Sequence, residues 1–354
     1  MEPVTHILTG AILARTGFNR KAAYATVAMM IAAELPDIDV LWSFGGPLTG
    51  FMHHRGITHT FVGVPFEAAL VTAVFWAIYT LRKPSHTKAP FSAAWLFLGT
   101  LVALLSHLLL DWTNNYGLRP FFPFNPRWYA GSFVFIFEPV LFAILVLALV
   151  GPWLFGLIDT EVGERRPLFR GRATAIVALF AIAALYLLRY VERDKAEMLA
   201  QQNAPADTTR VFASPYPGNP FKWHVVADTP ALYQLSTVDT WSGTVSNPEP
   251  RDTLVKPAET LPLLAAKRTE LGRVYLDWSM FPVIDELPAP PSADADPSHP
   301  LTEVTFSDAR FMYRTFLGGG SNTRPPLSAS VTLDMQAPEG QRVISTEMDG
   351  HRQK

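Results

Sequence analysis

Residues 92–110 have the sequence SAAWLFLGTLVALLSHLLL, which contains no charged side chain. Three further stretches are almost as apolar, with at most one charge each: 60–81 (Glu67), 131–158 (Glu138) and 173–188 (none). A helix needs about 17–25 apolar residues to cross a hydrocarbon core of about 30 Å. Three of the four stretches reach that length, and the fourth is at its lower limit. They predict four transmembrane helices. The alternative is that the four stretches are buried helices of a large soluble protein. We favour transmembrane helices because four runs of this length, with so few charges, follow one another.

The composition of the whole chain narrows the chemistry. Of the 354 residues, 49% are hydrophobic and 17% are charged, against about 25% charged in soluble domains. The absence of cysteine excludes disulfide scaffolds, Cys-ligated metals and Cys nucleophiles. A net charge of −2 gives no reason to expect nucleic acid as a partner. Any metal site must therefore be built from histidine and carboxylate side chains.

The regions on either side of the four stretches differ from them. Residues 4–17 and 19–34 are moderately apolar segments joined by a basic elbow, which predicts a helical hairpin partly embedded in the membrane. The start lacks the features of a signal peptide, so we expect His6 to remain in the mature protein. The last 154 residues hold 18 of the 30 prolines and short alternating apolar runs.

The fold class is therefore an α-helical multi-pass membrane bundle, made of the hairpin and four transmembrane helices, followed by a mostly β soluble C-terminal domain. We expect a membrane-embedded domain over 1–191, a linker over 192–220 and a β-rich domain over 221–354. The strands that we expect lie at 223–227, 274–278, 304–306 and 330–335, with a proline-rich loop over 288–300.

Lysine and arginine give an expected orientation, because short basic loops stay on the cytoplasmic side. Loops 82–91 and 159–172 carry three and four basic residues, whereas segments 35–59 and 113–130 carry one and two. We therefore expect a cytoplasmic (inner) membrane protein whose C-terminal domain is extracytoplasmic, although basic residues at 189, 193 and 195 weaken the bias.

Histidines and acids gather at the helix ends that this orientation places on the extracytoplasmic face. The group consists of His6, Glu34, Asp37, Asp39, His53, His54, His59, His107 and Asp111. His107 and Asp111 are four residues apart and share a helix face. Such nitrogen and oxygen ligands suit zinc, and also manganese or iron. The hypothesis is a site for one or more divalent metal ions, held by six candidate ligands: His6, Asp37, His54, His59, His107 and Asp111.

Several neighbouring residues allow more than one interpretation. Asp37 and Asp39 follow a proline and can share a face, one bridging two metal ions and the other orienting a histidine, or they can form an N-cap or turn pair. Arg55 suits a substrate anion or lipid headgroups. His53 is a ligand, a supporting group or solvent-exposed. Glu67 and Glu138 orient histidines, stay protonated, or pair with Arg119 or Arg127.

These motifs resemble those of the YdjM-like family of inner-membrane, LexA-regulated, metal-dependent hydrolases. The resemblance rests on residues 5–6 (TH), 35–39 (LPDID), 54–59 (HRGITH) and 107–113 (HLLLDWT), and it covers roughly residues 1–190. Where the family motif continues from His59 with serine, this chain has Thr60, which keeps the hydroxyl. A weaker likeness is to zinc-dependent phospholipase C. The resemblance implies a bacterial or archaeal multi-pass membrane hydrolase and leaves the tail after 192 without a role.

The function that we expect is hydrolysis of a phosphoester in a lipid or envelope molecule by a metal-activated water. Glu34 or Asp39 is the expected general base, and Arg55 the group that holds the anionic substrate. Two other classes remain open: a metal or proton transporter, and a membrane anchor for a β-rich binding domain. The bilayer and a small-molecule substrate are the expected partners, and the sequence does not define the oligomeric state.

Overall fold

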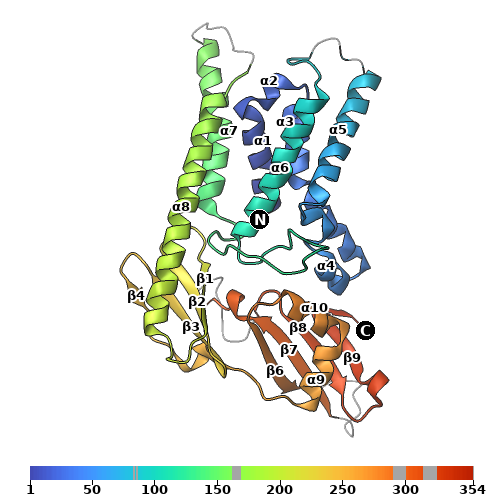
Figure 1. Cartoon of the computed structure of the whole chain (residues 1–354), viewed down its shortest axis with the longest axis vertical. Coiled ribbons are helices and arrows are strands. Elements are labelled where there is room, and N and C mark those ends of the chain that lie inside the picture. The colour runs from blue at the N-terminus through green and yellow to red at the C-terminus, as the bar shows by residue number, and fades with distance from the viewer. Residues whose placement is uncertain (83, 85–86, 162–168, 290–299, 314–324, 354) are drawn as a thin grey trace. The chain divides into compact units, whose positions relative to one another are not determined.

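The computed structural model of the chain describes residues 1–82, 84, 87–161, 169–289, 300–313 and 325–353 (Figure 1). Its described residues divide into two compact units. One comprises 1–41, 53–192 and 215–220, and the other comprises 42–52, 193–214 and 221–354. The first unit is helical and contains every candidate metal ligand. The second contains both β-sheets.

The helical unit begins with the expected hairpin. α1 (Pro3–Leu13) continues through a π-helical turn (Ala14–Phe18) and α2 (Asn19–Lys21) to the elbow, and α3 (Ala25–Glu34) returns. α1 and α3 pack against each other and against α6. Their close approach depends on small residues, since the buried face of α3 consists of Ala25, Ala28, Met29, Ala32 and Ala33.

Within the described part of the chain, four helices are long and apolar enough to cross a membrane. They are α5 (Gly63–Arg82), α6 (Ala93–Thr113), α7 (Pro139–Glu161) and α8 (Arg172–Asn203). Large apolar side chains such as Phe66, Leu147 and Phe180 point outward and are more than two-thirds exposed. An apolar surface of this kind is typical of lipid contact. The expectation of a helical membrane part is confirmed.

Two of the expected spans have different bounds. α7 begins only at Pro139, because proline fits the first turn of a helix, where its missing N–H costs nothing. α8 continues to Asn203, since no proline interrupts the chain before Pro205. The segment 192–220, which we expected to be a linker, therefore contains the last turns of α8 and a strand.

Between α3 and α5 the chain forms three short helices: the 3-10 helices Leu35–Gly45 and Ile57–His59, and α4 (Pro47–His53) between them. The middle of this segment, residues 42–52, belongs to the unit that holds the β-sheets. There Phe51 stacks on Tyr275 with ring centres 6.0 Å apart and meets Trp278 edge-on at 5.2 Å.

The C-terminal part contains two five-stranded antiparallel sheets, as expected for a mostly β domain. The first has the order β1-β2-β3-β4, with β5 also paired to β3, and the second has the order β10-β9-β8-β7-β6. The first sheet consists of β1 (Arg210–Pro215), β2 (Lys222–Asp228), β3 (Leu232–Asp239), β4 (Thr244–Val245) and β5 (Thr253–Val255). The second consists of β6 (Pro282–Pro288), β7 (Leu301–Asp308), β8 (Ala329–Asp334), β9 (Val343–Met348) and β10 (His351–Gln353).

Three of the four strands that we expected are present as β2, β7 and β8. The fourth, at 274–278, was wrong: these residues belong to helix α10 (Glu270–Trp278), which follows α9 (Leu261–Arg268). The Thr269 side chain caps α10 by accepting from the Gly272 amide, and Leu271, Tyr275 and Trp278 share its buried face. Most of the expected loop 288–300 lies outside the described residues.

A buried ion pair between Asp308 and Arg310 lies at the end of β7 and is hydrogen-bonded to the residues that follow α10. Asp308 accepts hydrogen bonds from the Arg310 guanidinium (2.9 Å), the Ser279 hydroxyl (2.6 Å) and the Met280 amide (2.9 Å). Burial opposes ionisation of Asp308, but Arg310 and these donors outweigh it and hold the pKa of the carboxyl below its usual value.

Candidate metal centre

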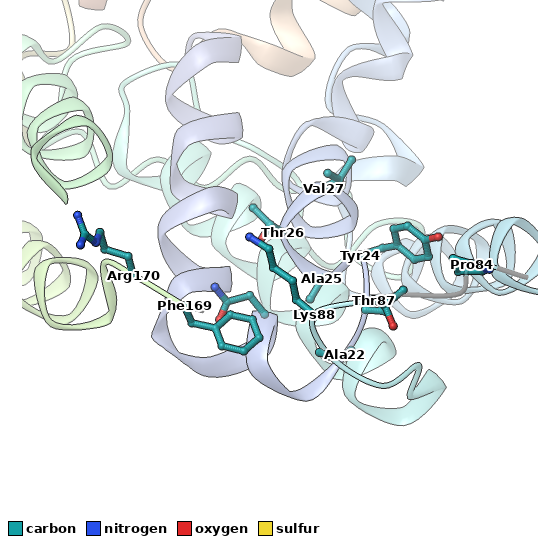
Figure 2. Close-up of a pocket in the computed structure, with 13 residues that line it drawn as sticks. Ala22, Tyr24, Ala25, Thr26, Val27, Pro84, Thr87, Lys88, Phe169 and Arg170 are labelled. Atoms are coloured by element: carbon teal, nitrogen blue, oxygen red, sulfur yellow. The ribbon is translucent and has the colours of Figure 1, made fainter. Parts of the chain in front are cut away.

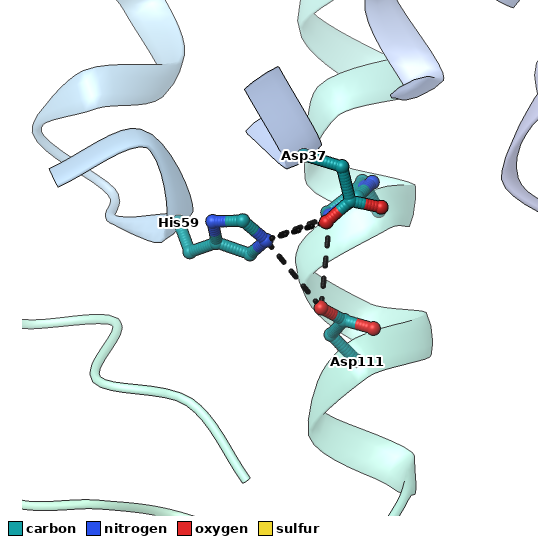
Figure 3. A group of neighbouring side chains, drawn as sticks. Asp37, His59 and Asp111 are labelled. Carbon is teal, nitrogen blue, oxygen red and sulfur yellow. Dashed lines mark hydrogen bonds and ion pairs between the residues drawn. The ribbon is translucent and has the colours of Figure 1, made fainter. Parts of the chain in front are cut away.

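Asp37, His59, His107 and Asp111 form a group in which one ligand atom from each residue lies within 4.8 Å of the others. Asp37 comes from the 3-10 helix after α3, His59 from the short 3-10 helix before α5, and the other two from adjacent turns of α6. Figure 3 shows Asp37, His59 and Asp111 pointing toward one another from these elements. Three segments far apart in the sequence therefore converge at one end of the bundle.

The separations between the ligand atoms are short and similar. His59 Nε2 lies 3.1 Å from His107 Nε2, 3.2 Å from Asp37 Oδ1 and 3.5 Å from Asp111 Oδ2. His107 Nε2 lies 3.7 Å from Asp37 Oδ1 and 3.6 Å from Asp111 Oδ2. A tetrahedral ion with ligands at about 2.0–2.1 Å requires about 3.3–3.4 Å between ligand atoms. The group has the size of such a coordination shell.

Hydrogen bonds on the far side of each imidazole set which nitrogen faces the centre of the group. His107 Nδ1 lies 2.7 Å from the Ala33 carbonyl oxygen, which can only accept, so Nδ1 carries the proton. His59 Nδ1 lies 3.3 Å from Asp39 Oδ2 and 3.1 Å from the Thr58 hydroxyl, and the carboxylate favours a proton there too. Both Nε2 atoms then present lone pairs to each other and to two carboxylates.

Four converging acceptor atoms repel one another unless a positive charge lies between them. Asp111 Oδ2 is buried and has no hydrogen-bond donor among the described residues, although leaving a buried acceptor unmet is costly. Asp37 Oδ1 faces the same two Nε2 atoms, which in these tautomers carry no proton and cannot donate to it. The residues present therefore fit a divalent metal ion.

Arg55 fixes the second oxygen of Asp111. Its Nη2 lies 2.9 Å from Asp111 Oδ1, and its Nη1 donates to the Gly117 carbonyl oxygen at 2.6 Å. The guanidinium also covers the ring of Tyr116, with 4.7 Å to the ring centre. Arg55 is buried and has a left-handed backbone (φ 53), a conformation that costs a non-glycine residue about 1–2 kcal/mol. This position suits a residue that holds Asp111 in place.

Asp39 supports the group from behind. Its Oδ2 accepts from the Arg55 amide at 2.7 Å and lies beside His59 Nδ1, and its Oδ1 lies 3.3 Å from His54 Nδ1. The two aspartates of the Asp37–Asp39 step thus divide into a residue of the group and a residue that orients a histidine. His54, a candidate ligand from the sequence, contacts Asp39 and is not one of the four.

His6 and Glu34 border the group without belonging to it. The His6 ring stacks on His107 at 3.8 Å, and its Nε2 lies 3.5 Å from Asp111 Oδ1, which also contacts the amino group of Met1. Glu34 ends α3, and its buried Oε2 has no hydrogen-bond partner among the described residues. Burial and then the nearby charge of Asp37 raise the pKa of Glu34 to about 8.

Glu138 has a different partner from those that the sequence suggested. It pairs with Arg189 of α8, and both side chains are buried. Arg189 also donates to the carbonyl oxygens of Tyr216 (3.0 Å) and Asn219 (3.2 Å). This pair joins α7, α8 and segment 215–220. In the sequence, it was indicated by Arg189, the charged residue directly after the apolar run 173–188. The buried Oε2 of Glu67 has no hydrogen-bond partner within the described part of the chain.

Comparison with known proteins agrees with this architecture. The family model of the YdjM inner membrane protein matches residues 1–196. The chain belongs to the YdjM inner membrane protein family. The matched part is more than half of the sequence and contains every residue of the metal-binding group, whereas the strands β1 to β10 lie beyond it.

A curated relative matches part of the chain. It is a Bacillus subtilis protein described as the uncharacterized protein YfhP, which is 28% identical over 164 residues. The match covers 44% of this chain and 47% of the relative, so the chain spans about half the length of the curated relative it matches. No solved structure matches the chain. Family membership and the four-residue group together fit a membrane protein that depends on a metal.

Proposed function

We propose that this protein is a membrane-bound metal-dependent hydrolase that acts on a phosphoester of a lipid or envelope molecule. The observation that carries the proposal is the convergence of two imidazole nitrogens and two carboxylate oxygens, 3.1–3.7 Å apart in the five pairs measured, from one partly exposed and three buried residues of a membrane bundle. Zinc is the metal that we propose, with manganese as the alternative.

Asp37, His59, His107 and Asp111 would hold the ion. A divalent ion at such a site lowers the pKa of a water and polarises a phosphoryl oxygen. The remaining residues prepare the site. Asp39 and the Ala33 carbonyl fix the imidazole tautomers, and Arg55 holds Asp111. Each of these contacts restrains a ligand before any substrate arrives, which reduces the reorganisation that binding requires.

Proton transfer is the proposed role of Glu34. Its carboxyl has an oxygen that is not engaged by other described residues, and a pKa near neutrality, which suits a group that accepts and returns a proton. Asp39 is engaged by Arg55, His54 and His59, so we assign it the orienting role in place of the base.

The position along the helices supports a substrate at the membrane surface. His107 and Asp111 lie in the last two turns of α6, which ends at Thr113. At 1.5 Å per residue, His107 is about 9 Å from the end of the span. A phosphoester carried by a lipid, or by an envelope molecule at the membrane, would meet the site at this depth.

Metal analysis of the detergent-purified full chain tests the proposal. We expect close to one zinc or manganese ion per chain in the wild type and negligible metal in His107→Ala with Asp111→Ala. His351→Ala, which changes an exposed histidine of β10, is the matched control and should keep wild-type metal content.

An activity assay completes the test. Release of the headgroup from short-chain phospholipids, or of p-nitrophenol from bis(p-nitrophenyl) phosphate, should depend on added metal and disappear in the double variant. Equal, negligible metal in wild type and variant would remove the basis of the proposal. Metal uptake into proteoliposomes without any hydrolysis would replace it with a transporter.

A further inference from the structure

A cavity of about 460 Å³ lies at the end of the helical unit opposite the metal-binding group. It is formed where α3 begins and where the α5–α6 connection passes, whereas the group lies where α3 ends and near the last turns of α6. About 14 residues of α6 separate the two ends, or about 21 Å. The residues used below are Asn19, Tyr24, Thr26, Lys88, Phe169 and Arg170, all of which line the cavity (Figure 2).

The depth of the cavity in the membrane follows from the spans on either side. α5 ends at Arg82 and α6 begins at Ala93, and each is about 30 Å long, the thickness of the hydrocarbon core. Residues 84 and 87–89, which line the cavity, come directly after the end of a span. The cavity therefore lies at the level of the lipid headgroups.

The charged side chains that the structure describes at the cavity are basic. Lys88 and Arg170 are among its lining residues, and none of the described lining residues is acidic. The Arg20 guanidinium lies over the ring of Phe169, 5.7 Å from its centre, and adds a third cation beside it. Figure 2 shows Lys88 directed into the space between Phe169 and the residues of α3. Basic pockets at the ends of spans favour anionic headgroups.

The polar groups that line the cavity can hydrogen-bond a hydroxyl group as well as a negatively charged phosphate. α3 starts at Ala25 without a side-chain cap, after Tyr24 in a left-handed conformation (φ 64). The Ala25 amide donates to the Ala22 carbonyl oxygen at 3.3 Å, so the next amides of the helix, those of Thr26 and Val27, are the donors that face negative charge. The Thr26 hydroxyl lies on the same wall. Asn19 also lines the cavity, and its amide group can hydrogen-bond a ligand hydroxyl.

We propose that this cavity binds the headgroup of an anionic phospholipid that carries hydroxyls, of the phosphatidylglycerol type. The phosphate meets Lys88 and the Thr26 and Val27 amides of α3, and a headgroup hydroxyl meets Asn19. The lipid is a ligand at the end of the bundle away from the metal group, so the proposal does not depend on hydrolase activity.

Native mass spectrometry of the full chain in neutral detergent tests this assignment. Phosphatidylglycerol and phosphatidylcholine with identical acyl chains are titrated separately, and we expect the first to bind at least tenfold more tightly. Lys88→Gln should remove most of that preference and Lys88→Arg should keep it. Arg82→Gln, which removes a cation at the end of α5 that does not line the cavity, is the matched control and should bind as the wild type does.

A second variant guards against loss of folding in the first. Asn19→Asp keeps the side-chain volume and adds a negative charge, so it should weaken phosphatidylglycerol binding without changing phosphatidylcholine binding. Equal retention of the two lipids by the wild type, or full phosphatidylglycerol binding by Lys88→Gln, would overturn the proposal. Inorganic phosphate or glycerol phosphate that binds as tightly as the lipid would assign the cavity to a soluble anion instead.

Discussion

The role of each residue in the metal-binding group follows from the hydrogen bond on its far side. His107 has the Ala33 carbonyl behind it, His59 has Asp39, and Asp111 has Arg55. These contacts leave Nε2, Nε2 and Oδ2 directed at the same point. These three groups, a carboxylate, a guanidinium and a carbonyl, therefore orient the ligands without belonging to the metal-binding group themselves.

Asp39→Asn isolates one of these supporting contacts. An amide is a weaker acceptor for His59 Nδ1 than a carboxylate, so we expect zinc affinity to fall about 10- to 100-fold. Competition titration with a zinc chelator measures the change. Asp37→Asn should cost more because it alters a ligand, and Asp207→Asn, at an exposed position, should cost nothing. Wild-type affinity in Asp39→Asn would contradict the orienting role.

Residue spacing predicted part of this site and could not predict the rest. His107 and Asp111 were identified because helix geometry alone places residues four apart on one face. The choice between His54 and His59 depends on the left-handed turn at Arg55 and the 3-10 turn that follows it, which no spacing rule specifies. Likewise, the partner of Glu138 came from α8, 51 residues away, and only the packing of α7 and α8 brings the two together.

At the level of elements, hydrophobic runs predicted the positions of the four long helices, because crossing a membrane requires a minimum apolar length. They did not predict that α8 continues to Asn203, since the end of that helix is polar. Short segments were harder. Residues 274–278 alternate enough to resemble a strand, but the Thr269 cap and the spacing of Leu271, Tyr275 and Trp278 favour a helix. A window of five residues cannot distinguish the two periods, whereas the cap that decides between them lies outside the window.

The contact between α1 and α3 gives a prediction for a pair of elements. A Cβ on Gly10 would meet the Met29 carbonyl oxygen and, at 2.9 Å, Ala33 Cβ. Gly10→Ala must therefore push the two helices apart, at a cost of about 1–3 kcal/mol. Because α1 carries His6 against His107, the shift also reaches the metal group. Thermal unfolding in detergent should show a lower melting temperature.

A second glycine provides the control. Gly340 is exposed and has open space where a Cβ would stand. Gly340→Ala should leave the melting temperature unchanged. If both variants melt together, close packing at Gly10 contributes nothing to stability.

At the scale of the whole molecule, the two ends of the helical unit have different chemistry. Acids and histidines gather where α3 and α6 end, and lysine and arginine gather around the α5–α6 connection and before α8. Basic connections are retained on the cytoplasmic side. The metal-binding group, at the opposite end of α6, is then expected on the extracytoplasmic face, and the same counting of spans places the β-sheets there.

The absence of cysteine from all 354 residues makes this orientation directly measurable, since any introduced thiol is the only one. Thr87→Cys places it in the exposed α5–α6 connection, and Ser242→Cys places it in the exposed turn between β3 and β4. In cells whose outer barrier has been removed, a membrane-impermeant maleimide should label Ser242→Cys directly and Thr87→Cys only after the membrane is opened. The opposite pattern would place the metal-binding group on the cytoplasmic face, where its substrate would have to be a lipid or metabolite of that side. Labelling of both variants in closed cells would mean that the three helices α6, α7 and α8 do not all cross the membrane, because an odd number of spans must put these two positions on opposite faces.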